Sequence, residues 1–280
     1  MSMRNTKETE REAEDSDQEI NPCTVLLVQE HEEGKPEAID DLVLHHHQQT
    51  FNLESIKSAV VIRQLPSQGL SFQLWPAATA FVSLLDRHDR SSTTLSSLLN
   101  RPHLGPLRIL ELGSGTGLVG IAAAAILGAH VTVTDLSHVI PNLKFNAEAN
   151  MNAVGLNGGK VEVAALGWGV EKEMEAIKEN DEYDVIMGSD VVYHDHLYNP
   201  LLQTLKYFLL GDRTKKEMVF VMSHLKRWKK ESVFFKKAKK DFDVEVIHKH
   251  DPCDGSRVGV LLYTFVAKNK KKKVEVAESQ

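Results

Sequence analysis

The segment ILELGSGTGLVG, residues 109–120, restricts the possible folds more than any other part of the chain. An apolar run typical of a buried strand leads into a glycine-rich turn, and the turn leads into an alanine-rich run typical of a buried helix. Glycines at such a turn let the chain reverse tightly and let a ligand approach the backbone. A strand, a glycine loop and a helix in this order predict an open α/β sheet that binds a ligand at the carboxyl ends of its strands.

Strand and helix patterns alternate along the rest of the chain. Seven strands are expected, at residues 108–113, 130–136, 160–168, 183–193, 217–225, 243–250 and 257–267. Helices are expected at residues 117–128, 137–151 and 198–210, with a basic amphipathic helix at 226–242. This alternation predicts parallel strands joined by right-handed crossovers. Only a short linker with an Asp-Gly turn separates the last two strands, so we expect these to form an antiparallel hairpin.

Two overlapping glycine patterns in the first segment point to different ligands. From Gly115, the spacing G-x-G-x-x-G is the fingerprint of dinucleotide binding. From Glu111, the spacing E-x-G-x-G-x-G is the form found where S-adenosylmethionine binds. Asp135 ends the second strand, where it can accept hydrogen bonds from ribose hydroxyls, and both ligands contain such a ribose. Asp135 therefore does not decide between them.

Three features favour S-adenosylmethionine. Gly113 starts the tight turn but has no part in the dinucleotide pattern. A carboxylate at Glu111 would be unfavourable near a negatively charged pyrophosphate and favourable near the methionine amino group of the other ligand. The expected C-terminal hairpin also differs from a plain dinucleotide fold, which ends on another strand–helix–strand crossover.

Four segments, LWPAATAF, LELGSGTGLVGIAAA, VTVTDL and GSDVVY, resemble in order and spacing the small seven-strand protein-lysine methyltransferases that lack a SET domain. The resemblance covers residues 60–267 and implies a Rossmann-like class I methyltransferase sheet, mostly parallel, with helices on both faces. The glycine motif alone is typical of the broad superfamily; LW-x-AA and Asp-x-x-Tyr narrow it to this group. The residues expected at the cofactor are Trp75, Glu111, Gly113, Ser114, Gly115, Gly117, Asp135, Trp168 and Ser189. Asp190 and Tyr193 are expected at the catalytic edge.

Several of these residues also have a structural interpretation. Trp75 precedes Pro76 and a helical pattern, so it also fits a hydrophobic staple at a helix start. Trp168 also fits an aromatic residue that caps the core, and it follows Gly167, where the family often has an acidic side chain. Asp190 ends a buried strand, where a carboxylate either faces a ligand or caps the next helix. We expect Asp190 to face the ligand.

Composition limits the class of protein. The chain has 280 residues, a formal net charge of −6 and two distant cysteines, Cys23 and Cys253. A disulfide framework, a zinc site and non-specific nucleic-acid binding are therefore not expected. The histidines at 45–47 lack further ligands at metal spacing, so we expect a loop or strand end there and no metal site. No secretory signal or membrane span is recognisable, which predicts a cytoplasmic protein.

Four regions are expected along the chain. Residues 1–20 are expected to form a disordered acidic tail, and residues 268–280 a disordered lysine-rich tail. Residues 21–107 are expected to form an N-terminal extension, with a hairpin in 58–75 and a helix from 77. Residues 108–267 are expected to form the cofactor-binding core. The lysines of this last tail are either a solvated end or a nuclear address. The basic segment 226–240 is either a docking surface for an acidic partner or a solvated helix face. Val233, Phe234 and Ala238 fit a buried stripe, so its lysines are expected on a solvated face.

The expected function is S-adenosylmethionine-dependent N-methylation of a lysine in a protein substrate, by an enzyme that is expected to be monomeric. Alternative acceptors are a protein histidine or a small molecule, although no insertion that would cover a small substrate is evident. An NAD-binding oxidoreductase is the competing class, but the Tyr-x-x-x-Lys or histidine dyad it needs is not found. The sequence does not identify the substrate protein or the number of methyl groups transferred.

Overall fold

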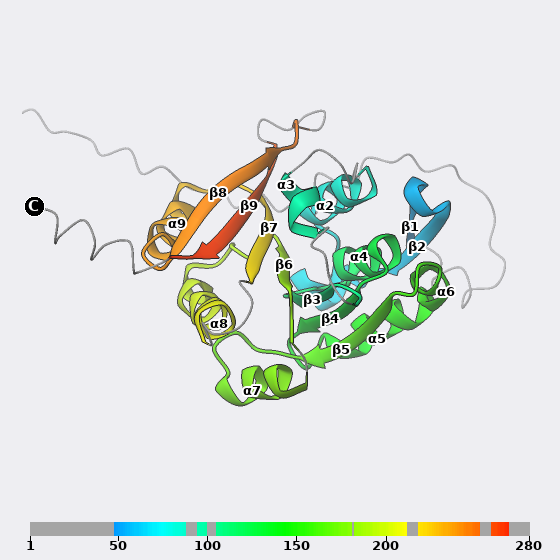
Figure 1. Cartoon of the computed structure of the whole chain (residues 1–280), viewed down its shortest axis with the longest axis horizontal. Helices are drawn as coiled ribbons and strands as arrows, with labels where there is room; N and C mark the ends of the chain where they lie inside the picture. Colours follow the sequence, from blue (N-terminus) through cyan, green and yellow to red (C-terminus); the bar gives the residue numbers. More distant parts are fainter. Residues whose placement is uncertain are drawn as a thin grey trace, which may run out of the picture. The chain divides into compact units, whose positions relative to one another are not determined.

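The core of the protein is a seven-stranded sheet. The computed structural model describes residues 48–87, 94–99, 105–180, 182–211, 218–252 and 259–268. Its strands are β3 (Arg108–Leu112), β4 (His130–Asp135), β5 (Lys160–Ala165), β6 (Val185–Ser189), β7 (Val219–Leu225), β8 (Phe242–Lys249) and β9 (Val260–Ala267). They lie in the order β5-β4-β3-β6-β7-β9-β8 (Figure 1). The first five in this order are parallel, whereas β9 is antiparallel to both β7 and β8. The predicted fold class is confirmed.

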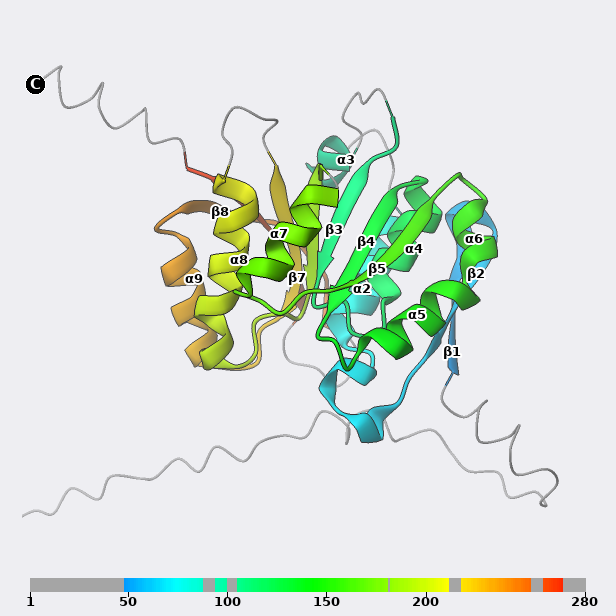
Figure 2. The ribbon, with the colours of Figure 1, turned by 90° about the horizontal axis from the view of Figure 1, so that it is seen from below.

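Helices cover both faces of this sheet (Figure 2). The α-helices are α2 (Pro76–Asp86), α3 (Thr94–Leu99), α4 (Leu118–Leu127), α5 (Ile140–Ala149), α6 (Met151–Gly155), α7 (Glu171–Asn180), α8 (Tyr198–Leu210) and α9 (Ser232–Ala238). Successive side chains of a strand point to opposite faces, so neighbours such as Ile109 and Leu110 enter different cores. Ile109 packs in the core that includes α2 and α4, and Leu110 packs in the core that includes α7, α8 and α9.

The N-terminal region contributes a hairpin, which packs on the helices α4, α5 and α6, and a helix, which packs on the sheet. Strands β1 (Gln48–Leu53) and β2 (Ser58–Arg63) pair antiparallel. The prediction of a hairpin within 58–75 was wrong in its second strand, because the partner of β2 lies upstream. Residues 64–75 instead contain two 3₁₀ turns, Pro66–Gln68 and Leu70–Phe72, and bury Phe72. The expected helix is present as α2, with Pro76 at its first position.

Three buried asparagines attach β2 to α5. The side-chain amide of Asn150 accepts the N–H of Val61 and donates to its carbonyl, both at 2.8 Å. The amide of Asn146 does the same at Arg63, at 2.8 and 3.0 Å. Asn142 accepts from the Arg63 guanidinium at 2.8 Å. The side-chain amides thus occupy the edge of β2 that does not face β1, as a neighbouring strand would. Asn146 also donates to the carbonyl of Thr116, in the loop after β3, at 2.9 Å.

The basic segment after β7 is helical over a shorter range than predicted. A 3₁₀ turn, η6 (Lys229–Glu231), precedes α9, which has only seven residues. Phe234 and Ala238 are buried as expected, but Val233 was wrongly predicted to be buried, since 47% of its surface is exposed. None of the helices that the structure describes is long and apolar enough to cross a membrane. Both predicted tails, except Lys268, lie outside the described residues.

Candidate active site

The glycine loop after β3 depends on residues with positive φ. Gly113, Gly115 and Gly117 have φ angles of 61°, 55° and 86°. A Cβ atom at Gly113 would lie 2.9 Å from Cζ2 of Trp168, and one at Gly117 would lie 2.6 Å from Cδ1 of Leu143. Both the backbone conformation and the close packing therefore require glycine here. The loop passes directly into α4, with Gly117 as its N-cap.

Hydrogen bonds fix this loop to the end of β4. The N–H of Ser114 donates to the carbonyl of Thr134 at 2.8 Å, and the N–H of Thr134 donates to the Ser114 hydroxyl at 3.0 Å. The N–H of Gly115 donates to Oδ2 of Asp135 at 2.8 Å. The carboxyl ends of β3 and β4 therefore form one rigid ledge, as the sequence predicted for a binding site at this edge.

Asp135 is buried at this ledge. Its Oδ1 accepts the N–H of Leu136 at 2.8 Å, so each carboxylate oxygen has one backbone donor. Burial raises the pKa of Asp135 against the opposing effect of these hydrogen bonds. A carboxylate oxygen can accept further hydrogen bonds, which is the property that the predicted contact with ribose hydroxyls requires.

Glu111 lies behind the ledge. Its side chain points into the core on the α4 face, with no exposed surface, and Oε2 accepts the N–H of Gly120 at 3.0 Å. Oε1 is buried and has no hydrogen-bond partner among the described residues. Burial raises the pKa of Glu111 to about 8. A direct contact with a cofactor amino group, as the sequence suggested, would require this carboxyl to leave its buried position.

Two tryptophans approach the ledge from different elements. The half-buried ring of Trp168, just after β5, lies against Gly113. Trp75, at the N-cap of α2, donates from Nε1 to the carbonyl of Leu70 at 3.0 Å. The guanidinium carbon of Arg227 lies 5.3 Å from the centre of the Trp75 ring, a cation–π contact. Trp75 therefore starts the helix and also faces the loop after β7.

The chain turns sharply after β6. Ser189 ends the strand, in register with Ser223 of β7, and Asp190 follows with a φ of 53°. Aspartate is one of the residue types that tolerate this left-handed conformation. The turn buries Val191 and Val192 and leaves Tyr193 half-buried. Burial, together with the nearby charge of Asp135, raises the pKa of Tyr193. The turn meets the glycine loop through Val191, whose Cγ1 would lie 3.2 Å from a Cβ atom on Gly113.

Asp190 does not cap the following helix. Its Oδ1 accepts the N–H of Leu225 at 3.0 Å, and its Oδ2 accepts from the Arg227 guanidinium at 2.8 Å. Nδ1 of His224 lies 3.6 Å from Oδ1. Burial opposes ionisation, but His224 and Arg227 outweigh it and hold the pKa of Asp190 below its usual range. The sequence argument that this carboxylate lacks structural partners was wrong.

The residues that hold Asp190 form a buried charged cluster that the sequence did not reveal. His224 and Glu231 are fully buried, and Nε2 of His224 lies 3.1 Å from Oε2 of Glu231. Glu231 also accepts the N–H of Arg227. Burial would lower the pKa of His224, but the carboxylates of Asp190 and Glu231 raise it. The sequence did contain one signal of this cluster, which is His224 near the end of a buried strand. A charged group in such a position needs buried partners.

These surroundings fit S-adenosylmethionine. The glycine loop lies at the carboxyl end of β3, Asp135 has acceptor capacity beside it, and Trp168 offers an aromatic ring against Gly113. These groups lie at the carboxyl ends of the parallel strands, where open α/β sheets bind their ligands. Among the described residues, no group of three or more His, Cys, Asp or Glu is arranged to hold a metal ion.

The sheet order and this site together define a seven-strand, class I methyltransferase fold. The chain belongs to the lysine methyltransferase family, whose sequence pattern matches residues 55–241. The resemblance to protein-lysine methyltransferases that the sequence motifs indicated is thereby confirmed.

Named relatives of this chain are also lysine methyltransferases. It is 38% identical over 120 residues to "EEF1A lysine methyltransferase 3" of Xenopus tropicalis, a match that covers 43% of this chain and 48% of the relative. It is 31% identical over 180 residues to "Protein N-lysine methyltransferase METTL21A" of Danio rerio, covering 64% of this chain and 72% of the relative. The match to METTL21A of Mus musculus is 37% identical and covers 51% of this chain and 60% of the relative.

Proposed function

We propose that this chain is an S-adenosylmethionine-dependent protein-lysine N-methyltransferase. One observation carries the proposal: the glycine loop contacts Asp135 through Gly115 and the Asp190–Tyr193 segment through Val191, at the carboxyl ends of β3, β4 and β6, in a member of the lysine methyltransferase family. The names of the relatives support a protein substrate. The predicted monomer and the cytoplasmic, in part nuclear, location remain predictions from the sequence.

The cofactor would lie on the ledge between β3 and β4. Gly113, Ser114 and Gly115 would line its amino-acid part, Asp135 would accept its ribose hydroxyls, and Trp168 would contact its adenine. Trp75, Gly117 and Ser189 complete the proposed site, and Glu111 supports the loop through Gly120. S-adenosylmethionine supplies a methyl group bonded to a positively charged sulfur.

The protein must present the acceptor amine without its extra proton. A lysine with a pKa near ~10.4 is mostly protonated at neutral pH. Asp190 is held ionised by His224 and Arg227, and its carboxylate oxygens have lone pairs that could accept an N–H from the substrate nitrogen. Tyr193 has a raised pKa and stays protonated. Its hydroxyl oxygen can also accept an N–H of the neutral amine, which orients the amine and leaves its lone pair free for the methyl group. The released proton leaves to solvent, and the placement of the amine provides much of the rate enhancement.

The first experiment is calorimetric titration of the purified protein with S-adenosylmethionine and, separately, with NAD. We expect binding of the methyl donor alone. The protein is then incubated with radiolabelled S-adenosylmethionine and cell extract, and labelled proteins are analysed for methyl-lysine by mass spectrometry. Binding of NAD alone, or label found only on histidine or on small molecules, would overturn the proposal.

Substitution of Asp190 tests its role in that reaction. Asp190→Ala removes both the charge and a residue that tolerates positive φ, whereas Asp190→Asn keeps the left-handed turn. We expect both variants to lose transfer by about a hundredfold or more, while affinity for S-adenosylmethionine stays close to that of the wild type. Asp243→Asn, at an exposed position of β8, is the matched control. Loss of cofactor binding in parallel with activity would instead make Asp190 a cofactor or folding residue.

A further inference from the structure

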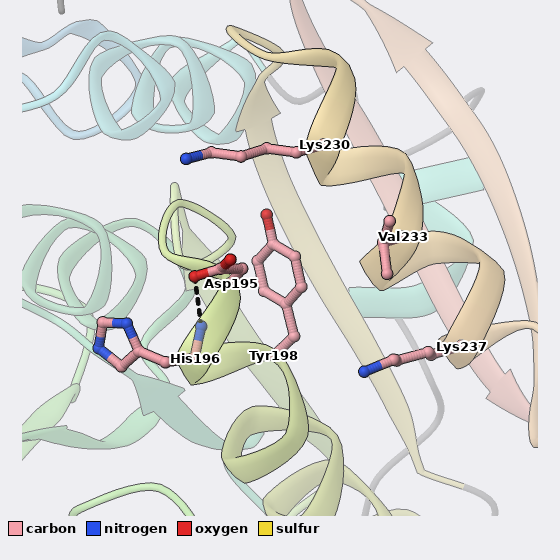
Figure 3. A pocket seen from close by; sticks show the side chains of 6 residues that line it. All are labelled: Asp195, His196, Tyr198, Lys230, Val233 and Lys237. Carbon is pink, nitrogen blue, oxygen red and sulfur yellow. Dashed lines mark hydrogen bonds between the residues drawn. The ribbon is translucent and has the colours of Figure 1, made fainter.

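A pocket lies on the segments that follow β6 and β7. It has a volume of about 430 Å³ and lies between the 3₁₀ turn η5 (Asp195–Leu197), the start of α8 and the η6–α9 segment (Figure 3). The residues that line it are Asp195, His196, Tyr198, Lys230, Val233 and Lys237. The last three belong to the basic segment, for which the sequence favoured a solvated face over a docking surface.

The walls of this pocket are continuous with the catalytic edge. Asp195 follows Tyr193 by two residues, on the loop that leaves β6. Lys230 directly precedes Glu231, which contacts His224 and so belongs to the cluster around Asp190. Two walls of the pocket are therefore joined to the catalytic edge by only one or two residues of chain.

The polar groups of the pocket favour an anion. Lys230 and Lys237 extend along two sides of the Tyr198 ring, and the Tyr198 hydroxyl points toward the Lys230 side (Figure 3). Tyr198 is only 2% exposed, and its hydroxyl has no hydrogen-bond partner among the described residues. The ammonium of Lys237 donates to Asn199 at 2.9 Å, which holds it at the pocket. The two lysine cations of the pocket match the negative charge of a carboxylate.

Other features restrict the size and kind of anion. Val233 contributes an exposed apolar wall, which suits the methylenes of a glutamate or aspartate side chain. Asp195 also lines the pocket, and its Oδ1 accepts the N–H of His196 at 2.9 Å. Its negative charge would repel a run of phosphates more strongly than a single carboxylate. The pocket therefore fits one acidic side chain better than a nucleic-acid backbone.

We propose that this pocket binds an acidic side chain of the substrate protein, close to the lysine that is methylated. The role of the pocket in substrate choice rests on the proposed function, but the binding of an acidic peptide can be measured without methyl transfer. The pocket also gives a role to Lys230 and Lys237 of the basic segment, which have no part in the proposed catalytic reaction. Lys230 and Lys237 would then determine which lysines in a target protein are accepted.

The test compares short synthetic peptides with one central lysine, flanked either by glutamates or by glutamines. Binding to the full-length protein with S-adenosylmethionine present is followed by fluorescence anisotropy. We expect the glutamate peptide to bind more tightly, and K230E/K237E to weaken its binding by about tenfold. K239E/K240E, the matched control, makes the same charge change on exposed lysines outside the pocket. V233E keeps both lysines but adds a carboxylate to the wall, and should weaken the same peptide.

The possible results separate this inference from the proposed function. Equal binding of the two peptides, or an equal effect of K239E/K240E, would overturn the acid-binding pocket. Tighter binding of a single-stranded oligothymidylate that depends on Lys230 and Lys237 would overturn it in favour of nucleic acid. If wild-type protein labels extract proteins and K230E/K237E labels them equally, the pocket fails and the function stands. If the glutamate peptide binds through the pocket but no protein is methylated, the function fails and the pocket stands.

Discussion

At the scale of single residues, the buried ionisable groups of the site differ in how their charge is balanced. Asp190 has Arg227, His224 and a backbone N–H to stabilise its negative charge. The charge of Glu111 is favoured by hydrogen bonds from Ser114 and the Gly120 N–H and opposed by burial and by Asp135. Its Oε1 has no hydrogen-bond partner among the described residues. The pKa of Asp190 is therefore lowered and that of Glu111 is raised, although both carboxylates are buried.

The raised pKa of Glu111 predicts a pH-dependent cost to stability. Between pH 4.5 and about 8, the Glu111 carboxyl is protonated in the folded protein and ionised in the unfolded chain. The free energy of unfolding therefore falls as pH rises through this window. Glu111→Gln keeps an acceptor for Gly120 without the charge. At pH 8 the variant should be more stable than the wild type by up to about 5 kcal/mol, with little difference at pH 5.

Urea denaturation at both pH values, without added cofactor, measures this difference. Glu148→Gln changes an exposed glutamate on α5 in the same way and should leave the pH dependence unaltered. If Glu111→Gln and the wild type lose stability in parallel between pH 5 and pH 8, Glu111 is not the group responsible.

At the scale of elements, three asparagines occupy one edge of β2 as a neighbouring strand would: Asn142 and Asn146 of α5, and Asn150 between α5 and α6. Asn146 is fully buried and contacts the backbone at both Arg63 and Thr116. It therefore connects the N-terminal hairpin to the glycine loop. The three asparagines are spaced four residues apart in NLKFNAEAN, which places them on one helix face. This spacing was a signal available in the sequence.

Asn146→Ala should destabilise the protein. It leaves the Arg63 N–H and carbonyl and the Thr116 carbonyl without this partner in a buried setting, at a cost of about 2 to 4 kcal/mol. Asn152→Ala, an exposed change on α6, should alter stability by less than about 0.5 kcal/mol. Urea unfolding of both variants provides the comparison, and equal stabilities would mean that water replaces the side-chain amide.

Elements with a strong local pattern were predictable, and contacts between distant elements were not. The strands β3, β4, β6 and β7 are rich in apolar residues and are buried along nearly their whole length, as expected for strands covered on both faces. The polar helix α7 has no comparable apolar run and was not predicted. The helix expected over 226–242 is cut short because Glu231 turns inward to His224 and Arg227. The contacts of His224 and Arg227 with Asp190 were not predictable either, since they depend on how β7 lies beside β6.

At the scale of the whole molecule, the candidate site joins segments from both halves of the chain. The 3₁₀ turn at Leu70–Phe72 lies against the glycine loop, because a Cβ on Gly115 would be 3.1 Å from the carbonyl oxygen of Ser71. Trp75 contacts Arg227, and Arg227 contacts Asp190. The N-terminal segment is therefore part of the site as well as a cover for the sheet.

This arrangement predicts which parts of the backbone a bound cofactor protects. A ligand that binds only the folded state suppresses the local openings through which amides exchange with solvent. With S-adenosylmethionine present, hydrogen–deuterium exchange should slow at residues 66–75, 113–117 and 190–193. The β8–β9 hairpin, at the far end of the sheet order from β4, should exchange as before. Asp135→Ala, which removes the acceptor of the Gly115 N–H, should lose this protection in all three segments. Protection of the glycine loop without residues 66–75 would mean that the N-terminal segment only covers the sheet, and Trp75 would lose its proposed place at the cofactor.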